Sequence, residues 1–348
     1  MSVRVSMLDI ARKAGVSRST VSFVLNGRKD ISIGAGTRER VCEAARALGY
    51  RANLMARALV SGRTHLIGLW TYGLDTAYCS RGLWLFKQEL SASEYELHIV
   101  QTDPEPKKDG LDARGDGWPV DGIVLRDVPA YAPRLLARAR GAPIPLVSMG
   151  LGFTTEVDHV GIAIHGAAVT AVEHLIALGR KRVAYVVPKA WSRPTDPRRK
   201  AYMETIRRFG LKPEVILTDY ADYVEMRQRA RERIRDHVAA RGCPGALFCY
   251  NDETAIGVQR GLFDLGLRVP EDAAIVGCDG IDETEFHQPA ISTIALPQEE
   301  MCRLAWQFLR RRIEEPEAPR QAAILEPRLV VRESSVCRQI EGVKKMTP

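Results

Sequence analysis

Residues 7–26, which read MLDIARKAGVSRSTVSFVLN, predict two short helices separated by a tight turn. Ser6 can cap the first helix, with an acid three residues further on, and Gly15 is placed to end that helix. Ser17 can cap the second helix, whose outer face is small, polar and basic. This spacing is typical of a helix-turn-helix that enters a DNA major groove. An ordinary helical hairpin on a protein surface is the alternative.

The positive charge of the chain is confined to the neighbourhood of this motif. The 348 residues carry a formal net charge of +7. Residues 1–65 hold 12 basic and 4 acidic side chains, a net of +8, and the remainder is close to neutral. A basic segment attached to a nearly neutral body is typical of a DNA-binding head on a separate regulatory body. The charge distribution therefore favours the helix-turn-helix over the hairpin.

A third helix is predicted in the head, with Thr37 as its cap and Gly49 at its end. The amphipathic residues 50–64 that follow could form about two helical turns, which is too short to be stable alone in water. We expect this segment to order only against DNA or a partner copy.

Several classes of protein are disfavoured by what the sequence lacks. No apolar run is long enough to cross a membrane and no signal-peptide region is present, so we expect a cytoplasmic protein without membrane contact. The seven cysteines form no CxxC pair, so we expect neither a disulfide framework nor a metal site. No nucleophile elbow, P-loop or early glycine-rich dinucleotide turn occurs, so we expect no enzyme and no cofactor.

Beyond residue 65, short apolar runs alternate with helical patterns. The strand-like runs are residues 66–70, 95–100, 122–125, 145–148, 182–187, 246–249 and 274–278, and residues 166–178 and 254–265 have helical periodicity. This alternation predicts parallel sheets covered by helices, and the length suits two lobes. Ligands in such folds bind near the carboxyl ends of the strands.

Ordered motifs run through most of the chain. The head contains DIARKAGVSRSTVSFVLNG, TRERVCEAARALGY and N-x-x-A-R-A-L. The body contains VDGIVL, HLIALGRKRVAYV, YNDETAIG, LGLRVPEDAAIVGCDG and QPAISTI. In this order they resemble a LacI/GalR-type bacterial transcription regulator.

The resemblance implies an N-terminal all-α helix-turn-helix head and an α/β periplasmic-binding-protein-like body of two parallel-sheet lobes. We expect a DNA-binding domain over residues 1–50, a hinge helix and linker over 51–65, an effector-binding and dimerisation domain over 66–336, and a tail over 337–348. The N-terminal lobe would comprise residues 66–150 plus 289–327, and the C-terminal lobe residues 158–288 plus 328–336. The chain would cross between the lobes three times, near residues 150–158, 288–299 and 327–333.

The same resemblance implies a set of DNA contacts. By position, Arg18, Ser19 and Phe23 would read base edges, and Leu59 would wedge into the minor groove. Phosphate contacts are expected from Ser6, Thr20, Ser22 and Asn26. Further DNA contacts are expected from Ser17, Asn53 and Ala56.

The effector contacts that the resemblance implies are Tyr78, Arg198, Tyr220, Asn251 and Asp279. Two structural alternatives stay open: Arg198 could belong to a solvated basic run, and Asp279 could cap a turn. Trp191 is expected to pack rather than to line the pocket. Ala163 and Ile164 stand where many members place Asp-Asn, so we expect one polar ligand contact to be missing and an ordinary hexose to be disfavoured.

Together these features predict a sequence-specific DNA-binding transcriptional regulator, a repressor that acts as a homodimer on a pseudo-palindromic double-stranded operator. A small-molecule effector, sugar or sugar-like, would bind between the two lobes. A solute-binding protein of a transporter is the alternative, and the basic head argues against it. The tail carries no heptad, so no tetramerisation helix is expected.

Replacing Leu59 with alanine is predicted to weaken operator binding while leaving the fold and effector binding intact, because a wedge side chain acts only on DNA. A gel shift and a thermal melt of the same preparation measure the two properties. Loss of folding in the variant would instead show that Leu59 belongs to a core.

Overall fold

The computed structural model describes residues 5–25, 31–50, 62–103, 120–138, 144–219 and 225–336. The chain divides into two compact units, residues 1–64 and residues 65–348. Most of the expected hinge and the whole of the expected tail, residues 337–348, lie outside the described residues.

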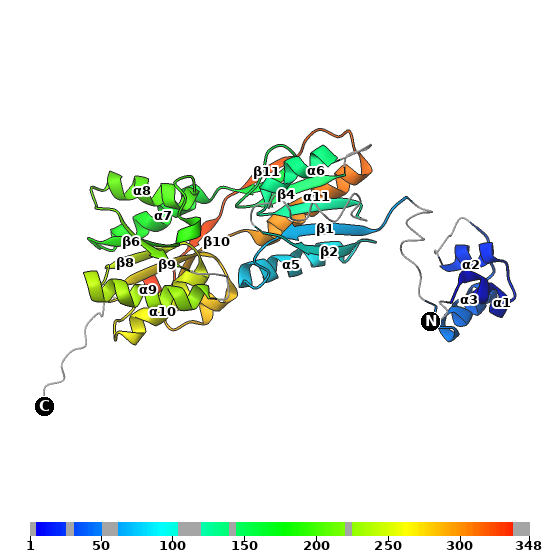
Figure 1. Ribbon diagram of the computed structural model, residues 1–348, viewed down its shortest axis with the longest axis horizontal. Helices are drawn as coiled ribbons and strands as arrows, with labels where there is room; N and C mark the ends of the chain where they lie inside the picture. The colour runs from blue at the N-terminus through cyan, green and yellow to red at the C-terminus, as the bar shows by residue number, and fades with distance from the viewer. Residues whose placement is uncertain are drawn as a thin grey trace, which may run out of the picture. The chain divides into compact units, whose positions relative to one another are not determined.

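The described part of the first unit is helical, in agreement with the predicted head (Figure 1). Its helices are α1 (Met7–Ala14), α2 (Arg18–Leu25) and α3 (Ala35–Ala47). Ser6 caps α1 as predicted, because its backbone N–H donates to the Asp9 carboxylate at 2.9 Å while its own hydroxyl accepts from the Asp9 N–H at 3.4 Å. Gly15, with φ of 65°, ends α1.

One core holds the three helices together. Ile10 of α1, Val21 of α2 and Val41 of α3 are fully buried in it. The expected cap at Thr37 is wrong: the N-cap of α3 is Gly34, three residues earlier, and no side chain caps the helix. Ala35 is a strong helix former, so the helix extends back to the extended Gly34 backbone instead of starting at the hydroxyl.

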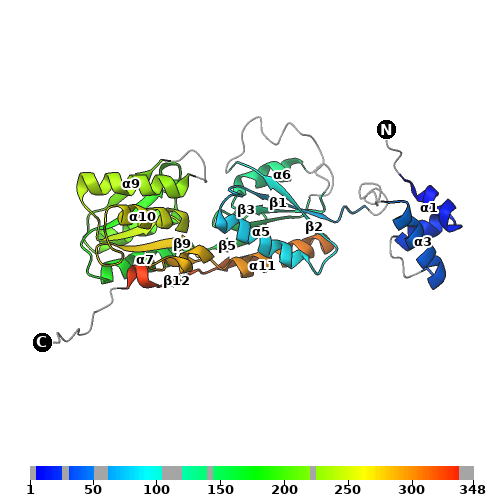
Figure 2. The same cartoon turned by 90° about the horizontal axis from the view of Figure 1, so that it is seen from below.

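The first lobe of the second unit is built on a six-stranded sheet in the order β11-β5-β4-β3-β1-β2, with every pairing parallel. Its strands are β1 (Leu66–Thr71), β2 (Glu96–Gln101), β3 (Gly122–Arg126), β4 (Leu146–Gly150), β5 (Asp158–Ile162) and β11 (Ala322–Leu325). Helices α5 (Ala77–Leu90) and α11 (Gln298–Glu314) pack together on one face, and η2 (Pro129–Tyr131) and α6 (Ala132–Arg138) lie over the other (Figure 2).

The second lobe is built on a sheet in the order β12-β10-β9-β8-β6-β7, in which only the β10–β12 pair is antiparallel. Its strands are β6 (Val183–Pro188), β7 (Glu214–Thr218), β8 (Ala246–Cys249), β9 (Ala274–Asp279), β10 (Ser292–Ala295) and β12 (Arg328–Val330). Helices α7 (Ile164–Ala177) and α8 (Pro197–Arg208) cover one face, and α9 (Met226–Arg241) and α10 (Asp252–Asp264) cover the other (Figure 1). Short 3-10 turns are η3 (Lys189–Trp191), η4 (Asp282–Phe286) and η5 (Glu333–Ser335).

Burial on both faces explains the apolar strand sequences. Every residue of β6 and of β9 is buried, as helix-covered parallel strands require. Tyr185 of β6 stacks between Tyr202 of α8 and Phe248 of β8, with ring centroids 5.4 Å from each. The prediction of helix-covered parallel sheets is therefore confirmed.

The chain passes between the lobes three times, as expected, but the expected lobe limits need correction. Residues 158–162 form β5, which pairs with β4 and β11 in the first lobe, so the first crossing follows residue 162 and not residue 150. Residues 292–295, assigned from the sequence to the first lobe, form β10 beside β9 in the second. Both strands contain buried polar residues, so they do not appear as apolar runs in the sequence.

The polar residue of β5 is held by a buried ion pair. The carboxylate of Asp158 accepts from the guanidinium of Arg312 on α11 at 3.0 and 2.9 Å, and from the backbone N–H of Gln321 at 2.8 Å. Burial alone would raise the pKa of Asp158, but the hydrogen bonds from Arg312 and Gln321 hold that pKa below its usual range. The pair joins β5, α11 and the start of β11.

Replacing Asp158 with asparagine is predicted to lower the free energy of unfolding by roughly 3 kcal/mol at pH 7, because Arg312 loses its charged partner. The lowered pKa means that this stability is present above the ordinary aspartate pKa, near 4, and is lost as the pH falls through the folded-state value. Urea unfolding at pH 7 and pH 3 measures the difference. The exposed Glu156→Gln serves as the control, and a gap between wild type and Asp158→Asn that is no narrower at pH 3 than at pH 7 would contradict the prediction.

Candidate functional site

The second helix of the head presents a polar and basic face. Arg18 and Ser19 are exposed, Ser22 and Phe23 are half-buried, and the intervening valines are buried in the core. The hydroxyl of Ser17 accepts from the backbone N–H of Thr20 at 3.0 Å, so Ser17 caps α2 as predicted. The face that α2 turns outward therefore carries the expected base-reading side chains.

The remaining expected DNA contacts are only partly described. Ser6 is exposed at the start of α1, and its hydroxyl donates to the Asp9 carboxylate at 2.7 Å. Asn26, Asn53, Ala56 and Leu59 lie outside the described residues.

A cavity of about 380 Å³ lies between the two lobes of the body. Residues at or just after the carboxyl ends of β1, β3 and β4 line it from the first lobe, and residues after β6, β8 and β9 line it from the second. This is where parallel α/β sheets bind ligands. The structure brings together four of the five expected effector residues on this cavity, namely Tyr78, Arg198, Asn251 and Asp279. Tyr220 lies outside the described residues.

Arg198 is buried in the cavity wall, so it is not a solvated member of a basic run. Its guanidinium pairs with Asp196 at 3.0 Å and donates to the carbonyl of Tyr250 at 3.2 Å. The same group lies 3.6 Å from the centroid of the Tyr250 ring. Burial opposes the charged form, yet the nearby Tyr250 and Asp196 keep the pKa of Arg198 well above its usual range. Arg198 thus offers a fixed positive charge to the cavity.

The second lobe also supplies Asn251 and Asp279. Asn251 caps α10: its side-chain oxygen accepts from the N–H and the hydroxyl of Thr254 at 3.0 and 2.7 Å. Asp279, the last residue of β9, has φ of 123° and is 6% exposed. Its carboxylate accepts no hydrogen bond from the described residues, which differs from the turn-capping alternative. Burial raises the pKa of Asp279 well above its usual range.

Asp252, next to Asn251, fixes the loop that follows Asp279. Its fully buried carboxylate accepts from the hydroxyl of Thr293 at 2.6 Å, from the N–H of Gly280 at 2.7 Å and from the N–H of Ile281 at 3.0 Å. Burial raises the pKa of Asp252 to about 6. The residue is structural, and it sets the position of the second-lobe wall.

Sequence reasoning missed an aromatic contact that bridges the lobes. Trp191, expected to pack elsewhere, lines the cavity and stacks on Tyr72 of the first lobe, with centroids 5.6 Å apart and planes 18° apart. Trp191 follows the carboxyl end of β6, and Tyr72 follows that of β1. These positions in the sequence could have indicated that both residues lie at the ligand cavity. Ile164 also lines the cavity, as an apolar side chain.

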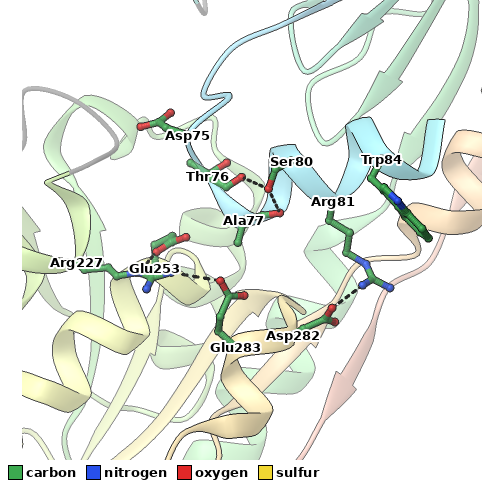
Figure 3. A pocket seen from close by; sticks show the side chains of 10 residues that line it. All are labelled: Asp75, Thr76, Ala77, Ser80, Arg81, Trp84, Arg227, Glu253, Asp282 and Glu283. Atoms are coloured by element: carbon green, nitrogen blue, oxygen red, sulfur yellow. Dashed lines mark hydrogen bonds and ion pairs between the residues drawn. The ribbon is translucent and has the colours of Figure 1, made fainter. Parts of the chain in front are cut away.

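A second hollow, of about 840 Å³, is also lined by residues of both lobes, beside α5, and shares only Thr76 with the first (Figure 3). Arg81 of α5 pairs there with Asp282 of η4 at 2.7 Å and with Glu299 of α11 at 3.2 Å. Arg227 of α9 contacts Glu253 and Glu283. Because these charges already satisfy one another, we take the smaller cavity between the lobes as the candidate ligand site.

Neither a membrane-spanning helix nor a cluster of metal ligands occurs in the described ranges. No helix there has the length and apolar character needed to cross a bilayer. No group of three or more potential metal ligands occurs in that part of the chain.

Comparison with known proteins places both units. Residues 6–53 match the model for bacterial regulatory proteins of the lacI family, and residues 172–335 match a periplasmic binding protein-like domain. The ribose operon repressor of Haemophilus influenzae is 29% identical over 337 residues, covering 94% of this chain and 98% of the repressor. The probable HTH-type transcriptional repressor ExuR of Bacillus subtilis is 27% identical, covering 95% of this chain and 98% of its own length.

Solved structures agree with this fold. A complex of the transcriptional regulator CelR with cellobiose is 26% identical, with a TM-score of 0.65, and covers 95% of this chain and 100% of that one. The lac repressor dimer bound to operator and the anti-inducer ONPF is 22% identical, with a TM-score of 0.77 over 96% of this chain and 100% of the repressor chain.

Replacing Arg198 with alanine is predicted to destabilise the body by roughly 3 kcal/mol, because Asp196 would be left without its cation and the Tyr250 carbonyl without a donor. The exposed Arg207→Ala, on the same helix, should change the free energy of unfolding by less than about 0.5 kcal/mol. Denaturant unfolding of both variants measures this. Equal effects of the two substitutions would show that the buried network of Arg198 contributes nothing.

Proposed function

Because the chain belongs to the LacI family of bacterial regulatory proteins, we propose that it is a repressor whose binding to double-stranded operator DNA is set by a small molecule between its lobes. It is a DNA-binding transcriptional regulator and not an enzyme. The observation that carries the proposal is the presence, in one chain, of a basic helix-turn-helix head and a lobed body with a polar cavity between its sheets. A solute-binding protein of a transporter would not need a DNA-binding head.

The DNA contacts follow from the face of α2. Arg18 and Ser19 would read base edges, because both are exposed on the helix that the fold leaves free for the major groove. Phe23 would add an apolar contact, for instance with a thymine methyl. Ser6, Thr20, Ser22 and Asn26 would contact DNA phosphates. Ser17, Asn53 and Ala56 would make further contacts with the DNA. A homodimer would present two heads to the halves of a pseudo-palindrome, and Leu59 of each hinge would wedge into the minor groove.

The effector would be sugar-like and would contact Tyr78, Arg198, Asn251 and Asp279, together with Tyr220. Relatives named for ribose and a solved neighbour with bound cellobiose support this class. A ligand that contacts both lobes stabilises one angle between them, and that angle would decide whether the paired hinges, residues 51–65, order on DNA. We place the protein in the cytoplasm, where its operator would be.

A gel shift with the DNA upstream of the protein's own operon tests the proposal at low salt, with and without candidate sugars. Wild type should bind a pseudo-palindrome there, and Arg18→Ala should lose roughly 1 to 3 kcal/mol of binding free energy and relax the preference at one base pair. Absence of any bound palindrome would contradict the repressor proposal. An unchanged base preference in Arg18→Ala would remove only Arg18 from the reading set.

A further inference from the structure

The first lobe contributes a carboxylate of its own to the cavity, that of Asp127, directly after β3. One oxygen of Asp127 accepts from the backbone N–H of Gly152 at 3.0 Å, and the other accepts from the hydroxyl of Tyr78 at 3.4 Å. The backbone of Asp127 is left-handed, with φ of 58°. Such a conformation is unusual for a residue other than glycine and is found where a side chain must be aimed.

Glycines on neighbouring elements make room for this part of the chain. Gly150, at the end of β4, has φ of 121°, and a Cβ built on it would lie 2.2 Å from a carboxylate oxygen of Asp127. A Cβ built on Gly82 of α5 would lie 2.5 Å from the guanidinium of Arg126. The absence of a side chain at Gly150 of β4 and at Gly82 of α5 therefore leaves room for Arg126 and Asp127.

Arg126 does not neutralise Asp127 by direct contact. Its fully buried guanidinium donates to the carbonyls of Cys79 and Tyr78 at 3.1 and 3.0 Å, and to the side-chain oxygen of Gln298 at 3.1 Å. Among the described residues, no ion pair within 4.0 Å joins Arg126 to Asp127. The carboxylate of Asp127 thus keeps acceptor capacity toward the cavity.

Asp127 and Asp279 line the same cavity from opposite lobes. Burial raises the pKa of both carboxyl groups, and for Asp279 the charges of Asp252 and Asp127 add to the effect. The other charged and titratable groups that act on this pair or line the same cavity are Arg126, Tyr78, Arg198, Asp252, Glu253, Tyr72, Arg193, Asp196 and Tyr250. Two ionised carboxylates that line the same partly buried cavity repel one another.

We propose that Asp127 and Asp279 grip the effector between them, so that the effector is a non-acidic compound whose hydroxyl or amino groups donate hydrogen bonds to both lobes. This inference rests on the proposed function. Asp127 would act as the first-lobe specificity residue, because a carboxylate or phosphate on the ligand at this point would face two acids. Donors from the ligand replace the repulsion by charge-assisted hydrogen bonds and hold the lobes together.

The carboxylate pair is tested first without any ligand, by thermal unfolding of Asp127→Asn, Asp279→Asn and the double variant. At pH 8 each single substitution should raise the unfolding midpoint by roughly 2 to 4 °C, and the double variant should gain less than the sum, because both changes relieve one repulsion. The raised pKa values mean that wild type regains this stability as the pH falls through them, so the gains should shrink toward pH 5. Asp75→Asn, an exposed acid outside the cavity, should have no effect.

A lowered unfolding midpoint in either single variant, or gains in the two single variants that add in full in the double variant, would contradict the proposed repulsion between Asp127 and Asp279.

The ligand class is tested by thermal shift with D-ribose, D-glucosamine and D-glucuronate. Stabilisation by a neutral or amino sugar supports the inference if the apparent Kd of that sugar rises about tenfold in Asp127→Asn. Stabilisation by glucuronate alone, or one that Asp127→Asn leaves unchanged, would refute it. If none of the three stabilises the protein, these monosaccharides are not its effector, which counts against the proposed function, while the ligand-free cycle still decides on the carboxylate pair.

Discussion

A single buried carboxylate, that of Asp252, determines how the second lobe presents its ligand-facing wall. Its acceptor oxygens tie the start of α10 to the loop after β9 and to the Thr293 hydroxyl of β10. The strand beneath must be free of side-chain bulk, since a Cβ on Gly277 would lie 2.2 Å from the same carboxylate. Asp279 and Asn251 stand directly beside this junction. The motif YNDETAIG therefore has a structural role: its Asp252 holds in place the residues that line the ligand cavity from the second lobe.

The contacts between the lobes fall into two groups with different physics. Inside the cavity, the Tyr72–Trp191 stack attracts through apolar and ring contact, while the acids on the two walls oppose one another. Outside it, Arg81 joins the lobes through exposed charges, which salt screens readily. The contacts that line the smaller cavity are thus separate from the exposed ion pairs of Arg81.

Strands could be predicted most accurately from the sequence where burial between helices was the only constraint on their residues. Strands covered by helices on both faces read as apolar runs, so β6, β8 and β9 could be placed to within a residue or two. Strand β5 could not, because Asp158 is satisfied by Arg312, which lies more than 150 residues away. Arg198 could be assigned from its motif. Asp127 could not, because its role depends on Gly150 and Asp279, which only the fold brings near.

The three passages between the lobes are very short: residue 163, residues 296–297 and residues 326–327. Pro297 and Pro327 fix φ in two of them, which removes one backbone rotation from each of these passages. Strand β1 ends at the cavity and begins at the opposite end of its lobe, roughly 20 Å away for six residues. The lobe is thus a lever arm, and each degree of swing carries the attachment point of the head by about 0.3 Å over that length.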